Sequence, residues 1–434
     1  MSNLEQRRKR IENALWGLFI ADSLAMPVHW YYARENIVKD FDGGVKTYEA
    51  PLHPHPEAFM VGMSYKPDVQ KAKSLSRPFD ILHDHSMFYQ TSWEDFTIER
   101  NDREGEHGNK VAAEDERYHY HHGLKAGDNT LNAHLARVLI RSVNKKGGYE
   151  AGAFLDDFVS YMTTPGQNKD PYTEVFLRRW FENYCNGDPV HACAQMQRDN
   201  WSIGSHGGMI RPMVLSLLSQ NPYQGIGMAL EHQVLTHRSE TVASGLAICV
   251  PLMFELINGE SDTKTAFRDA AKQVHMAGIR GEDLFAQYRA HKGPGNIPDD
   301  QMWAYHMELD DGPMDLDKLV DMGEQAVLRT EIGTVCYIEQ GLPMMFFIAD
   351  HEGYDFEKSL LLNVNAGGDN VNRGMPLGLM MGAGEDEVSS ALKEGLSDYL
   401  ALSDEISKFA DIAVSGEGVT TGFEAPSRRK GVIL

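Results

Sequence analysis

The sequence of 434 residues predicts a fold made of helices. Apolar residues recur at helical spacing over residues 4–26, and a second apolar stripe keeps the same spacing from Leu131 to Val143. Near the C-terminus, glycines at 374, 378 and 382 lie on one face of a further predicted helix, which therefore has no side chains along that face. Glycine at this spacing lets a neighbouring helix approach closely, and the 21 methionines can fill irregular gaps between helices.

The composition limits which partners the protein is expected to bind and in which compartment it is expected. The net charge of -22 would repel a phosphate backbone or an anionic membrane surface. The four cysteines are too sparse for a disulfide framework, which favours reduced thiols. The longest apolar run after the first helix, Ala243 to Phe254, is shorter than the roughly 20 residues of a membrane span. We expect a cytoplasmic protein that acts on a small molecule and binds neither nucleic acid nor a membrane, and we leave a homodimer open.

No Ser/Gly-rich or charged linker divides the chain, so we expect one helical domain over residues 1–412. Residues 43–117 lack helical periodicity, and eight of the 18 histidines lie between residues 53 and 122. We interpret residues 43–117 as a lid or subunit-contact insertion. A histidine-built metal site is the alternative, although its His-x-His pairs lack flanking Cys or Glu ligands. Residues 413–434 are expected to form a flexible tail.

The first helix ends near Pro27 and brings Asp22 and His29 to one neighbourhood. The next strong helix begins at Leu131, directly after a loop that contains Asp128. The free N–H groups and the positive dipole end of a helix favour anions and oxygen ligands at this place. Asp128 is therefore a candidate site residue, with a plain N-cap as the alternative.

The later helices are expected as two amphipathic helices within 150–195, an apolar helix after Pro212, and helices over 241–257, 330–349 and 387–402. In the segment before Pro212, Gly207 and Gly208 would bring backbone amides close to a ligand. Arg211 is available there to pair with an anion or a carboxylate, or equally to serve as a buried structural residue.

A turn at Gly367 and Gly368 follows the apolar helix that precedes it. Two glycines at a helix end can take left-handed backbone angles that other residues avoid, so the chain is expected to turn sharply. The polar side chains directly after the turn are expected to point into a packed core, and they are Asp369, Asn370 and Asn372.

Four of these segments resemble motifs of the ADP-ribosylglycohydrolase family. Asn-x-Gly-Gly-Asp at 365–369, followed by a Gly-x-x-x-Gly-Ala helix, resembles the C-terminal metal motif. Residues 127–130 resemble its Thr-Asp-Asp-Thr motif, 17–29 its opening motif, and 201–212 the Gly-rich segment beside its ribose-phosphate site. The resemblance implies an all-α orthogonal helical bundle with an irregular insertion. It also implies two Mg ions and cleavage of the N- or O-glycosidic bond between ADP-ribose and its acceptor.

The sequence departs from the family pattern at the metal positions. His29 stands where the family has a metal-site Glu, and Asn129, Val371 and Asn372 fall on motif positions that do not match. Two divalent ions call for several carboxylates because Mg prefers hard oxygen ligands. We therefore expect no pair of Mg ions, and at most a single Mg or Mn ion on Asp128 and Asp369.

These observations predict a glycohydrolase-like enzyme for an ADP-ribosyl, nucleoside or ribose-derived small molecule. His29, Asp128 and Asp369 are the candidate catalytic residues, with the two carboxylates within about 8 Å of each other and a near-neutral pKa for His29. The candidate substrate-binding residues are Asn129, Thr130, Ser205, Gly207, Gly208, Arg211, Gly367, Gly368, Asn370 and Asn372. The alternatives are an isomerase or lyase reaction in the same pocket, and a non-catalytic binding or crystallin-like structural protein.

Overall fold

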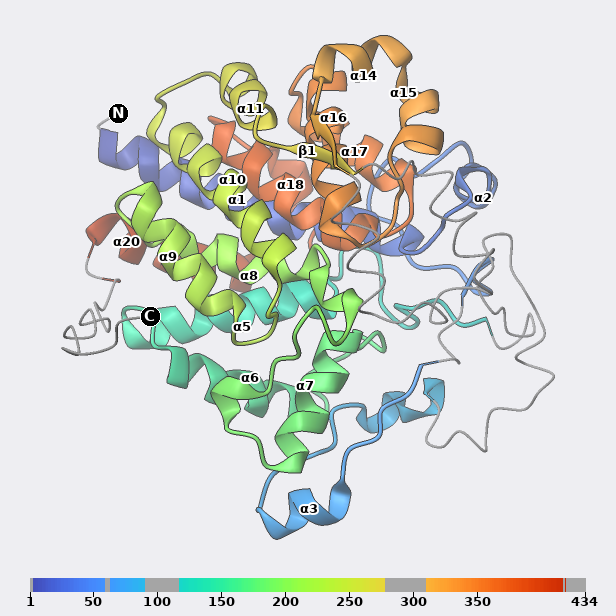
Figure 1. Cartoon of the computed structure of the whole chain (residues 1–434), viewed down its shortest axis with the longest axis vertical. Helices are drawn as coiled ribbons and strands as arrows, with labels where there is room; N and C mark the ends of the chain where they lie inside the picture. The colour runs from blue at the N-terminus through green and yellow to red at the C-terminus, as the bar shows by residue number, and fades with distance from the viewer. Residues whose placement is uncertain (1–2, 59–62, 90–116, 278–309, 417, 419–434) are drawn as a thin grey trace.

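The computed structural model describes residues 3–58, 63–89, 117–277, 310–416 and 418. These residues are helical over most of their length, which confirms the predicted helical fold (Figure 1). In the described part of the chain, the only named strands are β1 (His275–Ala277) and β2 (Asp310–Pro313). They pair antiparallel in a short ribbon.

The helices are given in chain order, the first set before residue 260 and the second set after it. The first set is α1 (Asn3–Ala25), α2 (Arg34–Asp40), α3 (Val69–Ser74), α5 (Leu131–Lys146), α6 (Ala151–Thr163), α7 (Val175–Asn186), α8 (Gly207–Ser216), α9 (Pro222–Gln233) and α10 (Glu240–Asn258). The second is α11 (Thr263–Ala271), α14 (Leu316–Met322), α15 (Glu324–Ala326), α16 (Ile338–His351), α17 (Phe356–Ala366), α18 (Asn370–Gly384), α19 (Ser390–Glu394) and α20 (Tyr399–Ser415). Short turns of other helix types are η1 (Met26–Val28), η3 (His83–Phe88), η5 (Val190–Ala192), η6 (Trp201–Gly204) and η7 (Val327–Glu331).

The crossing of α1 and α18 lies at the centre of the fold (Figure 1). A Cβ atom added to Gly17 would lie 2.0 Å from the carbonyl oxygen of Gly378, and one added to Gly378 would lie 2.2 Å from that of Gly17. Gly382 approaches the backbone of Asn13 in the same way. The predicted close approach is therefore confirmed. The two helices run antiparallel, so the start of α18 lies beside the end of α1.

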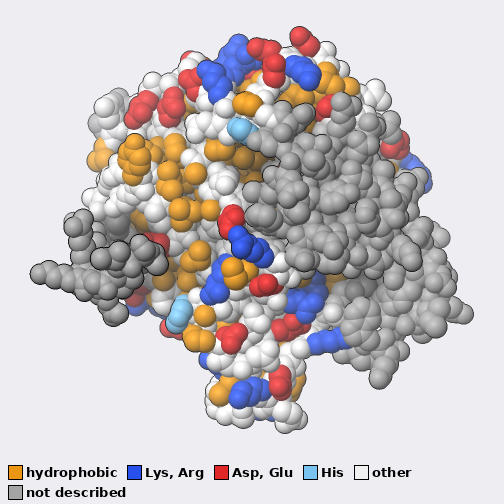
Figure 2. Space-filling model, in the orientation of Figure 1, with side chains coloured by type: hydrophobic (Ala, Val, Ile, Leu, Met, Phe, Trp, Pro, Cys, Tyr) orange, Lys and Arg blue, Asp and Glu red, His pale blue; other side chains and the backbone are white. Residues whose placement is uncertain are grey.

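Other helices enclose this central pair. Helices α8, α10 and α17 contact α18, α20 contacts α1, and α5 packs on α8 and α20. Among the described residues, α10 alone has the length and apolar composition of a membrane span, and most of its residues are buried inside the protein. Figure 2 shows apolar side chains gathered over α9 and α10, with charged side chains over α11 and α14.

Two predicted helices differ from the structure. The segment predicted as one helix over 387–402 forms α19 and α20, because the chain turns after Gly395 and packs against the loop at Gly127. Helix α20 continues to Ser415, so the predicted domain boundary at 412 falls inside a helix. The helix predicted from Thr330 begins only at Ile338, after a π turn and a short extended stretch.

Two parts of the predicted 43–117 insertion contact different helices: α3 packs on α7, whereas His55 and Glu57 contact the segment that follows α1. Both carboxylate oxygens of Glu57 accept hydrogen bonds from backbone amides, at Tyr32 and Ala33, each 3.0 Å long. The His55 ring contacts the backbone carbonyl of His29 at 3.0 Å. This part of the segment therefore supports the backbone around His29. The lid role stays a prediction, and residues 59–62 and 90–116 lie outside the described residues.

Candidate functional site

The Gly367–Gly368 turn positions the first residues of α18. Both glycines have positive φ, at 71° and 64°, which confirms the predicted sharp turn. Three backbone hydrogen bonds hold it: Trp30 N–H donates to Gly368 O, Gly368 N–H donates to Tyr31 O, and Asp369 N–H donates to Thr334 O. The turn thus fixes Asp369 directly beside the segment that follows α1.

The Asp369 carboxylate is fully buried among nitrogen groups. Its Oδ1 lies 2.9 Å from His29 Nε2 and accepts a hydrogen bond of 2.9 Å from Asn372 Nδ2. Its Oδ2 lies 3.4 Å from His206 Nδ1 but makes no hydrogen bond. Burial alone would raise the pKa of Asp369, but the contacts with His206 and His29 hold that pKa well below its ordinary value. Asp369 is therefore an ionised carboxylate whose Oδ1 faces His29 and whose Oδ2 faces His206.

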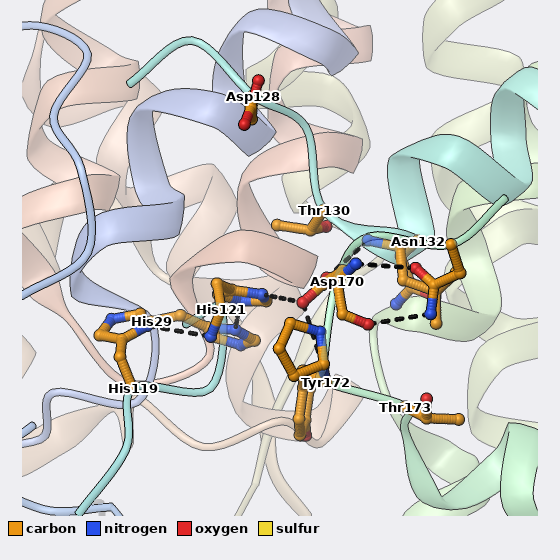
Figure 3. A network of polar contacts seen from close by, with 12 residues as sticks. His29, His119, His121, Asp128, Thr130, Asn132, Asp170, Tyr172 and Thr173 are labelled. Atoms are coloured by element: carbon orange, nitrogen blue, oxygen red, sulfur yellow. Dashed lines mark hydrogen bonds and ion pairs between the residues drawn. The ribbon is translucent and has the colours of Figure 1, made fainter. Parts of the chain in front are cut away.

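A line of hydrogen bonds continues from Asp369 through two histidines, and Figure 3 shows its part from His29 through His121 to Asp170. His29 Nδ1 lies 2.7 Å from His121 Nε2, and His121 Nδ1 lies 2.9 Å from Asp170 Oδ1. We call Asp369, His29, His121 and Asp170 the histidine relay. None of the four is more than 1% exposed. Burial lowers the pKa of His29 to about 4, so the expectation of a near-neutral pKa is wrong.

An amide bridges Asp369 to a second carboxyl group. Asn372 Nδ2 lies 2.9 Å from both Asp369 Oδ1 and Glu174 Oε1. Asn132 Nδ2 also donates to Glu174 Oε1 and, at 2.7 Å, to Asn372 Oδ1. Burial and the nearby charge of Asp369 raise the pKa of Glu174 to about 8. At neutral pH, Glu174 is thus protonated while Asp369 is ionised.

Arg211 brings a buried cation to the Glu174 side of the site. Its Nη2 donates a 2.8 Å hydrogen bond to Thr236 Oγ1, whereas its Nε and Nη1 have no partner. Its guanidinium carbon lies 5.4 Å from the centre of the Phe176 ring. Burial lowers the pKa of Arg211 to about 10, so the side chain remains charged at neutral pH. It presents two unused donors.

The structure does not bring Asp128 to Asp369. The Asp128 carboxylate is partly exposed and accepts a hydrogen bond from the Lys125 backbone amide, and Figure 3 shows it apart from the histidine relay. The neighbouring positions turn towards Asp22 instead: Asn129 Nδ2 and both the N–H and the hydroxyl of Thr130 donate to its carboxylate. The loop is therefore tied to α1 through Asp22. The expectation that the carboxylates of Asp128 and Asp369 lie together is therefore corrected.

The remaining predicted binding residues divide into two groups. Gly207 faces the site, since a Cβ atom there would lie 3.4 Å from Glu174 Oε2 and 3.6 Å from Ser205 Oγ. The others serve packing or backbone hydrogen bonding: Gly208 lies against His237, Gly367 against Tyr31 O, Gly368 against Thr334 O, and Asn370 donates to Val364 O.

The model of one protein family, described as ADP-ribosylglycohydrolase, matches residues 3–421. The chain belongs to the ADP-ribosylglycohydrolase family. A solved structure titled "ADP-ribosylglycohydrolase-related protein complex" matches with a TM-score of 0.50 and 14% identity, covering 94% of this chain and 99% of that chain. At this identity the likeness concerns the fold, and it confirms the all-α bundle of this family. A search of curated proteins gives no significant match.

The residues present do not fit the two Mg ions that the ADP-ribosylglycohydrolase family implies. Asp369 Oδ1 already faces two nitrogen groups, and the Asn372 amide nitrogen points at the carboxyls where a metal would need an oxygen. Asp128 lies elsewhere, Asn129 is bound to Asp22, and Val371 is apolar and buried. In the described part of the chain, no group of His, Cys, Asp and Glu is arranged to hold a metal ion. A single Mg or Mn ion at Asp369 stays a prediction.

Several residues of this site were not predicted from the sequence: Asn132, Asp170, Glu174, His206 and His121, which belongs to one of the His-x-His pairs. Asp170 and Glu174 lie in an irregular segment before α7 whose side chains carry no periodic signal. A Cβ atom at Gly341 would lie 1.4 Å from His206 Nε2, so α16 has a glycine where the His206 ring fits. Such complementarity between distant segments could not be read from either one alone.

Proposed function

We propose that the protein hydrolyses the glycosidic bond of an ADP-ribosyl, nucleoside or other ribose-derived small molecule. The observation that carries this proposal is the pair Asp369 and Glu174, two buried carboxyl groups with opposite protonation states. Since each has an oxygen 2.9 Å from the same Asn372 nitrogen, those two oxygens are at most twice that distance apart. This upper limit is compatible with the shorter of the two separations found in glycoside hydrolases, the roughly 5–5.5 Å between the paired carboxyls of retaining enzymes.

The different protonation states suit two different roles. Protonated Glu174 acts as the general acid: it gives its proton to the oxygen or nitrogen that leaves, while the bond from that atom to the ribosyl carbon breaks. Ionised Asp369 stabilises the positive charge that develops on the ribosyl ring. Glu174, which has given its proton to the leaving group, then accepts a proton from the water that attacks the ribosyl carbon and so returns to its starting state. Carboxyl groups of this chain thus supply both proton transfers.

Substrate recognition is assigned to Arg211 and the turn before α8. The two unused donors of Arg211 suit acceptor oxygens such as those of a phosphate or a ribose hydroxyl. The absent side chain of Gly207 lets the backbone at the start of α8 lie close to Glu174 Oε2. This arrangement supports a polar substrate that reaches Glu174 from the side of α8.

The test measures release of free ribose or ADP-ribose from N- and O-linked ADP-ribosyl compounds and from nitrophenyl ribosides. Glu174→Gln and Asp369→Asn should each lower turnover by about 100-fold or more, the usual contribution of an acid or base. Glu387→Gln, at an exposed position, is the matched control and should leave turnover unchanged. Full activity in Glu174→Gln would refute the acid role. Binding of these compounds without any bond cleavage would support the non-catalytic alternative.

A further inference from the structure

The histidine relay contains more hydrogen bonds than two neutral histidines can supply. Its three contacts, at 2.9, 2.7 and 2.9 Å, each join two atoms that need one proton between them. Two neutral imidazoles carry one N–H proton each, and ionised carboxylates carry none. Two protons cannot serve three contacts. The relay must therefore hold a third proton, which makes one of the two rings an imidazolium.

The surroundings of Asp170 place this charge on His121. Among the described residues, His121 is the one ionisable side chain within hydrogen-bond distance of the Asp170 carboxylate, which also accepts from the backbone amides of Leu131 and Tyr172. Asp369, at the other end, shares its charge with His206 and interacts with the buried Arg373. Burial opposes ionisation of Asp170, but His121 and these amides outweigh it and lower the pKa of Asp170. An ionised Asp170 pairs with a charged His121.

We propose that His121 is a buried imidazolium that, through its Nε2–H, fixes His29 in the Nε2–H tautomer and so keeps a hydrogen-bond donor on Asp369. His121 and Asp170 are then positioning residues, and this role rests on the proposed function of Asp369. The proposal satisfies each contact: His121 donates to Asp170 and to His29 Nδ1, while neutral His29 donates to Asp369 Oδ1.

Other groups around His121 are consistent with this charge. The rings of His55 and His119 are kept neutral because burial lowers the pKa of His55 to about 3 and that of His119 well below its ordinary value. Asp22, on α1, is attracted to His121, although burial raises the pKa of Asp22 to about 6. The ring of Tyr172 meets His121 edge-on at 5.8 Å. His121 is thus the cation among neutral rings and two nearby carboxylates.

The relay can move a proton without turning either ring. If His29 gives its Nε2 proton to Asp369, it can take the Nε2 proton of His121 at its own Nδ1. His121 is then left neutral, with its remaining proton on Nδ1 towards Asp170. Every proton lost by one atom is gained by the next. The relay can therefore deliver one proton to Asp369, and the reverse steps return that proton to His121.

Nitrogen NMR of the ¹⁵N-histidine-labelled full chain tests the charge without any substrate. At neutral pH we expect one histidine with both ring nitrogens protonated, absent from His121→Gln, and one neutral Nε2–H histidine, absent from His29→Gln. Neutral spectra for both rings in the unmodified protein would overturn the proposal. Because this measurement needs no turnover, it can fail while the hydrolase proposal stands, or hold while that proposal fails.

Substitution of Asp170 provides a second test of the proposal. Asp170→Asn should remove the doubly protonated signal and lower kcat by roughly tenfold or more at unchanged KM. In Ser-His-Asp catalytic triads, the same replacement of the orienting carboxylate leaves the histidine in the wrong tautomer and lowers kcat. Asp80→Asn is the matched control, since Asp80 contacts His83 at 3.4 Å but at the surface. It should leave the relay signals unchanged. Asp170→Glu restores the charge and should recover the signal, and an unchanged signal in Asp170→Asn would refute the role of Asp170.

Discussion

Replacing Glu174 by Gln should change how stability depends on pH. Glu174 is 8% exposed, and burial together with the charge of Asp369 raises its pKa from an ordinary value of 4.5 to about 8. Glutamine keeps the shape and an acceptor oxygen for Asn132 and Asn372, but it cannot ionise. The comparison of the two proteins therefore isolates the ionisation of this one carboxyl.

The sign follows from proton binding. The folded protein holds the Glu174 proton more tightly than the unfolded chain does, so the stabilisation is fully present below the unfolded pKa and is lost as pH rises through the folded pKa. Each unit of pKa difference corresponds to about 1.4 kcal/mol. Between about pH 5 and pH 8, the free energy of unfolding of the natural protein should fall by about 4 kcal/mol relative to Glu174→Gln.

Urea unfolding followed by circular dichroism, at several pH values in this range, measures the difference. Other ionisable groups contribute equally to both proteins and cancel, provided that both unfold in a two-state manner. The exposed Glu387→Gln variant should show no such pH-dependent difference. Parallel curves for the natural protein and Glu174→Gln would show that Glu174 is ionised in the folded state. The assignment of the general acid would then fail.

Two further predictions concern the framework of the site. Gly378→Ala should lower the free energy of unfolding by about 3 kcal/mol or more, because its Cβ would press on the backbone of Gly17, whereas Gly227→Ala, with open space around it, should be neutral or slightly stabilising. Asp22→Asn should cost about 1–3 kcal/mol in a thermal or urea melt at neutral pH, since an amide N–H would face donors at Thr130 that now meet a carboxylate. Unaltered stability of either variant would contradict the packing or hydrogen bonding described.

Local features of this fold could be predicted from the sequence, whereas contacts between segments far apart in the chain could not. The close approach of a helix to α18 was predictable because glycine spacing reports directly on how close a helix can come, whereas the identity of that helix, α1, was not. The Gly367–Gly368 turn was predictable because positive φ is nearly confined to glycine. These features depend on the residues at one place in the chain.

The partners in the site depend on competition between distant groups. Asp128 precedes a helix, Asp22 lies near the end of α1, and both match family positions. The Thr130 hydroxyl donates to the buried Asp22, whereas Asp128 accepts from the Lys125 backbone amide in its own turn. His121 looked like one of many loop histidines because its role depends on Asp170, which lies on another segment. No local sequence pattern predicts these hydrogen-bond partners, because they depend on which side chains the packed helices bring within hydrogen-bond distance.

The Asn372 amide has a consequence for how mutations combine at this site. Both its N–H directions are used, towards Asp369 and Glu174, and its oxygen accepts from Asn132. A change at any one of these residues therefore leaves its neighbours with unmatched groups, and substitutions within the set will not be additive. A second substitution should cost far less than the first. Natural or engineered variation should accordingly alter positions 132, 174, 369 and 372 as a group, through intermediates that are poorer than either end point.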